Sequence, residues 1–318
     1  MFDLAGGPTG GAARFRREAE QWVAALPARD VRLVGLARRL GPGWLVAREL
    51  IEPQRRRIAA NNVSFVTGRG PRIVLLNNAL HFLRPGEIDR LPGVPADLRR
   101  QSRVVLGAAL RADVIVVPCT DMAERVTAGL PRVASRVVVR HQPYTVTHSR
   151  RPGDGTGYVL YPSIPAPHKD LVGGVQLLAD AIAESGLDLE VRVTCTDADL
   201  ANVARRLGVR AIGPQSLDGL DQLLAGAALV FSPYTTESYG YPVAEARAVG
   251  VPVVGVDTAQ NREIGSRALV GFTAGDRDSL ARALEVAVAT SVDPDPAPFE
   301  AAAYFAWLTT LTSATEGS

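Results

Sequence analysis

The sequence predicts an α/β fold built from two doubly wound parallel sheets. Short apolar runs alternate with amphipathic helical patterns along both halves of the chain, as is typical of parallel sheets covered by helices. The 318 residues, 47% of them apolar, suffice for two cores of about 150 residues each. Residues 1–150 hold 24 arginines and 12 acidic residues, a net charge of +12, whereas residues 151–318 hold 11 basic and 21 acidic residues, a net charge of −10. We therefore expect one domain over 1–148 and a second over 149–295, joined through the Pro- and Gly-containing stretch at 148–157.

In the first half, apolar runs predict buried strands and the segments between them predict helices. The expected strands are residues 31–36, 72–76, 113–117 and 136–139, and the expected helices are residues 12–25, 97–110 and 121–128. Only five residues precede the first glycines, so the first strand is expected to be very short or to have lost its start. A glycine loop containing Gly10 and Gly11 follows it.

The second half repeats the scheme. The expected strands are residues 158–161, 189–194, 211–213, 228–231 and 251–256, and the expected helices are residues 171–183, 198–207, 217–224, 243–249 and 278–288. An aromatic segment at 296–312 predicts a further helix. In doubly wound folds ligands bind at the carboxyl ends of the strands, and Gly10, Lys169 and Glu237 are all expected at such ends.

Two carboxylates, Glu237 and Glu245, lie eight positions apart around a Gly-Tyr-Pro turn between an expected strand and an expected helix. Pro242 suits the first turn of a helix, so the backbone N–H groups of Gly240 and Tyr241 are expected at the positive end of the helix dipole, where anions bind. Each carboxylate accepts hydrogen bonds from hydroxyl groups. A phosphate with a polyol on either side fits this pattern, which predicts a nucleotide-sugar site.

The chain has 35 basic residues, and Lys169 is the one lysine among them. It follows an expected strand and precedes an expected helix, where its compact ammonium group is placed to meet the same phosphates. An exposed lysine at the start of a helix is the alternative.

The segment from Glu237 to Glu245 resembles the Glu-x7-Glu signature of the retaining glycosyltransferases of family 4, which have the GT-B fold. Further resemblances support it along nearly the whole chain: the glycine loop at 8–14, the strand at 111–118, the donor-phosphate loop at 161–169 and the strand at 231–234. The resemblance implies two Rossmann-like domains that face each other across a cleft. It also implies that residues 296–318 form a crossover helix and tail returning to the first domain.

Site roles follow from the resemblance. It implies that Glu245 holds the ribose, that Glu237 contacts the donor sugar, and that Lys169 with the amides of Gly240 and Tyr241 neutralises the leaving diphosphate. It implies same-face attack by an acceptor hydroxyl, with no metal and no cofactor beyond the nucleotide sugar as co-substrate. The further candidates are Ser163, Tyr239, Gly10 and Gly11 on the donor and His81 beside the transferred sugar, although His81 and Tyr239 suit structural roles as well.

One departure from the family bears on activity. Members usually carry an arginine a few residues before the phosphate-binding lysine, whereas this stretch holds Ser163 and no arginine. Two alternatives therefore stay open: a GT-B enzyme that epimerises or hydrolyses a nucleotide sugar, and a catalytically silent nucleotide-binding scaffold.

The sequence gives little support for a metal site, a phosphate-binding or dinucleotide loop, or a nucleic-acid-binding motif. The two cysteines lie far apart, the four histidines lack metal-ligand spacing, and the acidic pair at 197 and 199 suits a helix N-cap better than a metal. The segment at 6–13 lacks the residues of a phosphate-binding loop or a dinucleotide fingerprint, and no nucleic-acid-binding motif accompanies the arginines. We expect a cytoplasmic protein. The basic first domain is expected either to meet an anionic or lipid-linked acceptor at the inner membrane face or to complement the acidic second domain.

Overall fold

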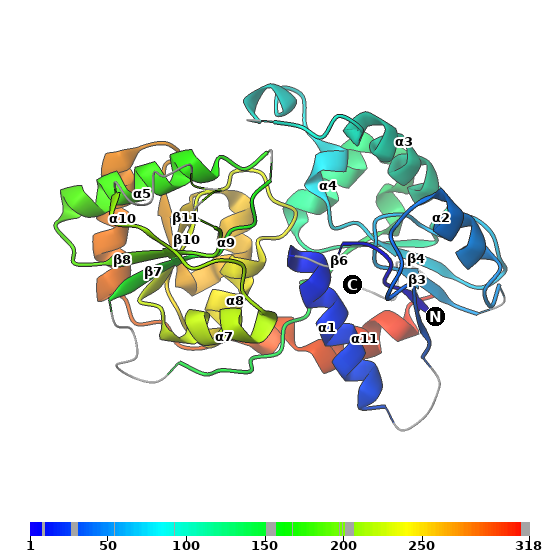
Figure 1. Cartoon of the computed structure of the whole chain (residues 1–318). Coiled ribbons are helices and arrows are strands. Elements are labelled where there is room, and N and C mark those ends of the chain that lie inside the picture. The colour runs from blue at the N-terminus through cyan, green and yellow to red at the C-terminus, as the bar shows by residue number, and fades with distance from the viewer. Residues whose placement is uncertain are drawn as a thin grey trace. The chain divides into compact units, whose positions relative to one another are not determined.

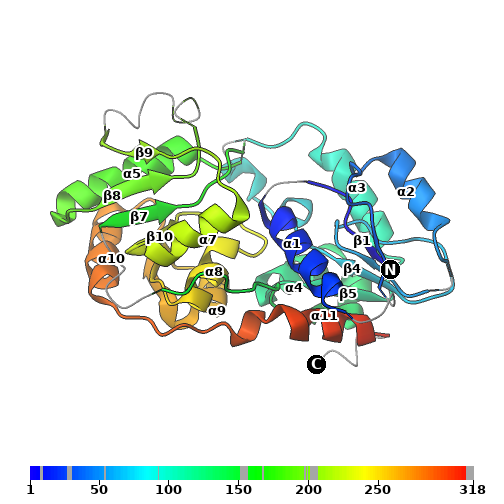
Figure 2. The ribbon, with the colours of Figure 1, turned by 60° about the horizontal axis from the view of Figure 1, so that its bottom comes forward.

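The computed structural model describes residues 1–7, 10–26, 31–53, 55–91, 93–150, 157–166, 168–196, 198, 200 and 207–312. Two compact units make up the chain. The first comprises Met1–Asp89, Pro95–Thr145 and the chain from Phe299 on, and the second comprises Arg90–Val94 and Val146–Pro298. Each unit contains one six-stranded parallel sheet with helices packed on it, which confirms the predicted fold class (Figures 1 and 2).

The first sheet has the strand order β2-β1-β3-β4-β5-β6. Its strands are β1 (Phe2–Asp3), β2 (Leu33–Val34), β3 (Arg57–Ala59), β4 (Arg72–Leu75), β5 (Val114–Val117) and β6 (Val137–Val139). The helices of this unit are α1 (Gly10–Ala24), α2 (Pro42–Glu49), α3 (Leu98–Ala109) and α4 (Thr120–Gly129), with short 3-10 turns η1 (Ala79–Phe82), η2 (Ile88–Arg90) and η3 (Pro131–Arg136). The central strands are buried on both faces, which explains their continuous apolar sequences.

The second sheet has the strand order β12-β11-β10-β7-β8-β9. Its strands are β7 (Tyr158–Tyr161), β8 (Glu190–Val193), β9 (Arg210–Ala211), β10 (Leu229–Ser232), β11 (Val253–Val256) and β12 (Leu269–Phe272). Its helices are α5 (Leu171–Ser185), α7 (Leu217–Gly226), α8 (Tyr241–Val249), α9 (Ala259–Gly265) and α10 (Arg277–Ala289), with the 3-10 turns η4 (Ser266–Ala268) and η5 (Ala297–Phe299). The direction of winding reverses between β7 and β10, and such a switch point is where doubly wound sheets bind ligands.

The last helix, α11 (Ala301–Thr310), packs on α1 in the first unit (Figure 2). The Trp22 and Phe305 rings stack with centroids 5.3 Å apart, and Phe15 meets the same ring edge-on at 5.4 Å. Both aromatic residues of α11 that enter this core, Tyr304 and Phe305, are buried. The aromatic segment near the C-terminus therefore belongs to the first core, as the predicted crossover requires.

Several elements differ from the sequence predictions. The strand expected at 31–36 spans only Leu33–Val34, and β3, β12, α2 and α9 had not been predicted at all. The helix expected at 198–207 lies mostly outside the described residues. Strands β2 and β3 span two and three residues, too few to show a period of two, so tertiary contacts define them. No helix within the described ranges is both long and apolar enough to cross a bilayer.

Candidate functional site

The switch point of the second sheet brings Lys169 and Glu237 together. Lys169 lies in the loop after β7 and Glu237 in the loop after β10, and these two strands are neighbours in the sheet. The Lys169 Nζ and Glu237 Oε1 atoms are 2.6 Å apart, and the two side chains keep 20% and 24% of their surface exposed. Residues 68 positions apart in the sequence thus form an ion pair at the edge of the sheet where a ligand is expected.

Tyr234 lies beneath this ion pair. The Lys169 ammonium is 4.2 Å from the centre of the Tyr234 ring, a cation–π distance. The Tyr234 hydroxyl shares a 2.5 Å hydrogen bond with the Ser163 hydroxyl and accepts another from Tyr161 at 3.1 Å. Ser163 is in turn fixed by its backbone, since its N–H donates to the Thr194 hydroxyl and its carbonyl accepts from it. The loops after three adjacent strands are therefore tied together under Lys169.

The glycines at the start of α5 permit this close packing. A Cβ atom on Gly174 would lie 2.7 Å from the Tyr161 hydroxyl, closer than real Cβ atoms come. Asp170 caps the helix by accepting a hydrogen bond from the Gly173 N–H at 2.9 Å. The Lys169 backbone thus enters α5 in a fixed conformation.

The nearby carboxylate and burial shift the pKa of Lys169 in opposite directions. Burial lowers its pKa, but the attraction of Glu237 and a hydrogen bond to that carboxylate outweigh burial, and the net effect is a raised pKa. The ammonium group is therefore charged at neutral pH. Burial and the adjacent Lys169 lower the pKa of His168, although Glu237 opposes them.

The start of α8 supplies the second part of the site. Gly240 precedes the helix with φ of 80°, a left-handed conformation that glycine adopts without strain, and Pro242 occupies the first turn. The first turn of α8 contains no acidic residue, and the positive end of the helix dipole lies at this turn. Glu245 lies one turn further along and is only 3% exposed.

Two neighbouring tyrosines from the sequence prediction contact each other here. Tyr239 is buried, and its ring meets the Tyr241 ring edge-on with centroids 5.3 Å apart. This contact braces the turn that carries Gly240.

Residues of the first unit form a separate group. Gly10 begins α1 with φ of 62°, Gly11 follows it, and the first turn of α1 holds no acidic residue. His81, in η1 after β4, is half-buried: its Nδ1 lies 3.1 Å from the Ser102 hydroxyl and its Nε2 lies 3.3 Å from the Asn78 amide nitrogen. Burial lowers its pKa. Both ring nitrogens thus have protein partners, and the suggested contact of His81 with a sugar stays a prediction.

Sequence reasoning had assigned no role to Tyr234 or His168. Tyr234 comes two residues after β10 ends, so an aromatic side chain at a strand's carboxyl end was the available signal. His168 belongs to the predicted donor-phosphate loop at 161–169, but its own side chain carried no distinguishing signal. Its Nδ1 atom is buried and has no hydrogen-bond partner among the described residues.

Within the described residues, no group of three or more His, Cys, Asp or Glu side chains is placed to hold a metal ion. The acidic pair at 197 and 199, expected to act as a helix cap, lies outside the described residues.

Comparisons with known proteins concern the family and the fold. Residues 168–289, which include the ion pair and α8, match the family described as glycosyl transferases group 1. No curated protein sequence matches the chain.

Solved structures resemble the fold at low sequence identity. WaaG, a glycosyltransferase involved in lipopolysaccharide biosynthesis, is 14% identical with a TM-score of 0.65, and the match covers 91% of this chain and 90% of WaaG. TarM of S. aureus is 11% identical with a TM-score of 0.60, covering 84% of this chain and 54% of TarM. HepE of Anabaena is 18% identical with a TM-score of 0.55, covering 82% of this chain and 75% of HepE. The fold is GT-B, and residues 168–289 match the family of group 1 glycosyl transferases.

Proposed function

We propose that this protein transfers a glycosyl group from a nucleotide sugar to an acceptor hydroxyl with retention of anomeric configuration. The observation that carries the proposal is the ion pair between Lys169 and Glu237 at the switch point, next to the turn that starts α8. TarM has been described in complex with UDP, and HepE in complex with UDP-glucose. A nucleotide sugar is the ligand whose charges and hydroxyl groups suit this set of residues.

Binding of the donor exchanges the partners of the ion pair. The diphosphate approaches the Lys169 ammonium and the amides of Gly240 and Tyr241, while hydroxyl groups of the donor sugar donate to Glu237. Glu245 accepts from the ribose hydroxyls. Ser163 acts through the Tyr234 hydroxyl that it fixes, and Tyr239 braces the turn.

The chemical step places new charge where these donors lie. The bond from the anomeric carbon to the diphosphate oxygen breaks as the bond to the acceptor oxygen forms on the same face. The acceptor proton passes to the leaving phosphate. Because the leaving group gains negative charge in the transition state, a fixed ammonium and fixed amides stabilise that state more than the ground state. The proposed reaction uses no metal ion, and full activity in excess EDTA is the expected outcome.

The first unit is proposed to hold the acceptor, with its Gly10 and Gly11 on the donor and its His81 beside the transferred sugar. Gly10 and Gly11 lie at the carboxyl end of β1, and His81 follows β4, so all three belong to the ligand-binding edge of their sheet. An anionic or lipid-linked acceptor at the inner membrane face is proposed for this basic unit.

The test begins with thermal stabilisation by UDP, GDP, ADP and their sugars, followed by product analysis with the donor that binds. Proton NMR of the product's anomeric signal distinguishes retention from inversion. Turnover without any acceptor would indicate the epimerase or hydrolase alternative, and binding without turnover on a broad acceptor panel would indicate the scaffold alternative. Donor binding that is unchanged in both Lys169→Met and Glu245→Ala would refute the site assignment.

A further inference from the structure

Lys169 has two partners of different kinds. The Glu237 Oε1 atom lies 2.6 Å from its Nζ atom, and the centre of the Tyr234 ring lies 4.2 Å from the same nitrogen. The Glu237 side chain keeps 24% of its surface exposed, so a ligand that arrives from solvent can take its place beside the ammonium group. Glu237 is therefore the exchangeable partner of Lys169.

The hydroxyl of Tyr234 holds its ring in place. It lies 2.5 Å from the Ser163 hydroxyl and accepts a hydrogen bond from Tyr161 at 3.1 Å. Ser163 is 2% exposed and Tyr161 is fully buried, with its ring packed edge-on against Phe231 at 5.2 Å. Burial raises the pKa of Tyr234 although Lys169 opposes that shift, so the hydroxyl keeps its proton at neutral pH. Tyr234 is therefore the fixed partner of Lys169.

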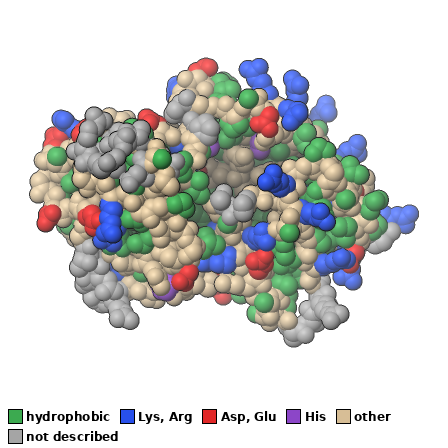
Figure 3. Space-filling model, in the orientation of Figure 1, with side chains coloured by type: hydrophobic (Ala, Val, Ile, Leu, Met, Phe, Trp, Pro, Cys, Tyr) green, Lys and Arg blue, Asp and Glu red, His purple; other side chains and the backbone are tan. Residues whose placement is uncertain are grey.

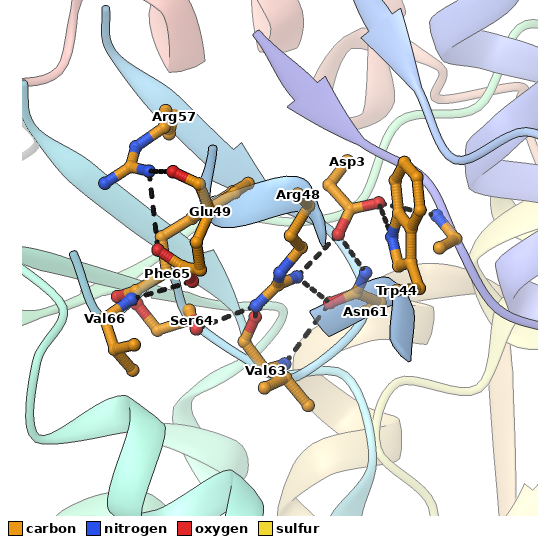
Figure 4. Close-up of polar contacts among 11 residues, drawn as sticks. Asp3, Trp44, Arg48, Glu49, Arg57, Asn61, Val63, Ser64, Phe65 and Val66 are labelled. Carbon is orange, nitrogen blue, oxygen red and sulfur yellow. Dashed lines mark hydrogen bonds and ion pairs between the residues drawn. The ribbon is translucent and has the colours of Figure 1, made fainter. Parts of the chain in front are cut away.

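Aromatic rings elsewhere in the chain pack on cations that are closed off from ligands. In the first unit the centre of the Phe65 ring lies 4.3 Å from the guanidinium carbon of Arg48 and 4.6 Å from that of Arg57 (Figure 4). Both arginine side chains are at most 1% exposed, and Arg48 also donates to the Asp3 carboxylate and to two backbone carbonyls of the loop after β3. Those contacts stabilise the fold. Lys169 differs, because 20% of its side chain is exposed at the ligand-binding edge of its sheet.

We propose that Tyr234 is a positioning residue for the donor diphosphate: its ring stays in contact with the Lys169 ammonium while the diphosphate replaces Glu237. A ring attracts a cation through its π face. The lysine side chain has a flexible aliphatic stem, and without a second contact it would move once its carboxylate partner is displaced. The ring therefore keeps the ammonium in one place in both the free and the bound protein. Because the ligand is the donor diphosphate, this inference rests on the proposed function.

The direction of one affinity change separates this proposal from its opposite. If the ring contacts the ammonium in both states, that contact cancels from the binding free energy, and its removal adds only the cost of ordering a long side chain. Tyr234→Leu should then weaken diphosphate binding about three- to tenfold. If instead the diphosphate drew the ammonium off the ring, the ring would stabilise the free protein alone, and Tyr234→Leu would tighten binding by about 2- to 30-fold.

Isothermal titration with UDP, GDP and ADP measures this change on the full chain, and the nucleotide that binds the parent protein most tightly serves for all variants. Tyr234→Phe keeps the ring and removes the hydroxyl, so it should bind within about threefold of the parent protein. In a Lys169→Met background, Tyr234→Leu should change the affinity by less than about twofold, because its effect acts through the ammonium. A tyrosine that only stabilises the fold would weaken binding equally in both backgrounds.

The single lysine of the chain allows the contact itself to be measured. Isotopic labelling of lysine at its ε carbon gives one lysine signal by NMR, and the ring current of Tyr234 shifts the protons on that carbon upfield when the ring faces the ammonium. We expect this shift in the free protein, and we expect it to persist when the diphosphate saturates the site. It should be absent in Tyr234→Leu and present in Tyr234→Phe.

A matched control removes a ring at the other end of the same strand. Tyr158 begins β7, and the centre of its ring lies 3.8 Å from the guanidinium carbon of Arg192, which pairs with Glu190 at 2.7 Å. Tyr158→Leu thus breaks up the same combination of ring, cation and carboxylate away from the site. Its diphosphate affinity should stay within about twofold of that of the parent protein. Thermal unfolding establishes that each variant is folded at the temperature of the titration.

A second control addresses attraction by net charge alone. Basic side chains outnumber acidic ones over the first unit (Figure 3), and such a field attracts a diphosphate without any specific contact. Arg99→Gln with Arg100→Gln removes two exposed arginines of α3. This variant should also bind the diphosphate within about twofold of the parent protein.

Three results would overturn the proposal and leave the proposed function intact. They are unchanged or tighter diphosphate binding in Tyr234→Leu, loss of the upfield shift when the parent protein is saturated, and equal weakening by Tyr234→Leu in the parent and Lys169→Met backgrounds. If none of the three nucleoside diphosphates binds the parent protein, the proposed function fails and this inference fails with it.

Discussion

Mutation of Lys169 or Glu237 tests the proposal that the bound diphosphate replaces Glu237 as the partner of Lys169. Unit charges 2.6 Å apart attract by about 1.6 kcal/mol at the dielectric constant of water and by about 6 kcal/mol at an effective value of 20. Because both side chains keep about a fifth of their surface in solvent, we take about 2 kcal/mol for this pair. A ligand phosphate that replaces Glu237 must overcome this attraction. Glu237→Gln should therefore tighten nucleoside diphosphate binding by up to about 30-fold.

The same substitution should slow catalysis. Since Glu237 is proposed to contact the reacting sugar, Glu237→Gln should lower kcat by about 10²-fold, by analogy with loss of one preorganised contact. Lys169→Met should weaken diphosphate binding and lower kcat/KM by at least about 10²-fold. The double variant should bind diphosphate more tightly than Lys169→Met alone, because it no longer leaves an unpaired carboxylate beside the phosphates.

Isothermal titration with the nucleoside diphosphate of the identified donor, together with steady-state kinetics, measures both effects. The control is Arg277→Met and Glu184→Gln, since Arg277 and Glu184 also lie 2.6 Å apart but are 55% and 39% exposed. Those variants should change neither quantity. Weaker diphosphate binding in Glu237→Gln than in the parent protein would refute the exchange of partners.

Three further outcomes are expected. Glu245→Ala should weaken nucleotide binding with little change in kcat, whereas Glu237→Ala should chiefly lower kcat. If each variant changed nucleotide affinity and kcat to the same extent, the assigned roles would be contradicted. Arg48→Leu leaves the buried Asp3 carboxylate without its cation, so it should lower the free energy of unfolding by about 3–5 kcal/mol. Urea titration measures this change, and a loss below about 1 kcal/mol would contradict the prediction. Burial lowers the pKa of His81 in the folded protein, whereas in the unfolded chain the imidazole keeps its ordinary pKa near 6.5. The unfolded state therefore binds more protons as the pH drops from 7.5 to 5.5, and the free energy of unfolding should fall over that range. His81→Gln should reduce that slope by at most about 1.4 kcal/mol per pH unit, and an unchanged slope would argue against a buried neutral imidazole.

The sequence was informative where a segment carried a continuous apolar run or a long helical repeat. The buried strands β5 and β10 were predicted from apolar runs, and the long helices α5 and α10 were predicted from apolar residues that repeat over many positions. By contrast, β1, β2 and β3 contain two or three residues each, and α2 begins with Pro-Gly directly after Gly41. The Arg48 contacts stabilise α2 from outside its own sequence, and no local pattern encodes them.

The candidate site was predicted as far as strand order allowed. Lys169 and Glu237 were each expected at the carboxyl end of a strand, but only the sheet topology makes β7 and β10 neighbours. The packing of Lys169 on Tyr234 depends on side-chain directions, which strand order does not specify. The structure also leaves the functional roles of Ser163, Gly10, Gly11 and His81 as predictions, because their assignment depends on ligands.

The return of α11 to the first core has a consequence for folding during synthesis. The second unit, Val146–Pro298, is complete before α11 leaves the ribosome, whereas the first core lacks Tyr304 and Phe305 until then. At roughly 5–20 residues per second, translation from Thr145 to the end of α11 takes on the order of ten to thirty seconds. Throughout that interval Phe2, Phe15 and Trp22 lack the rings that cover them in the folded protein. The half of the protein that is made first is therefore the half that finishes folding last.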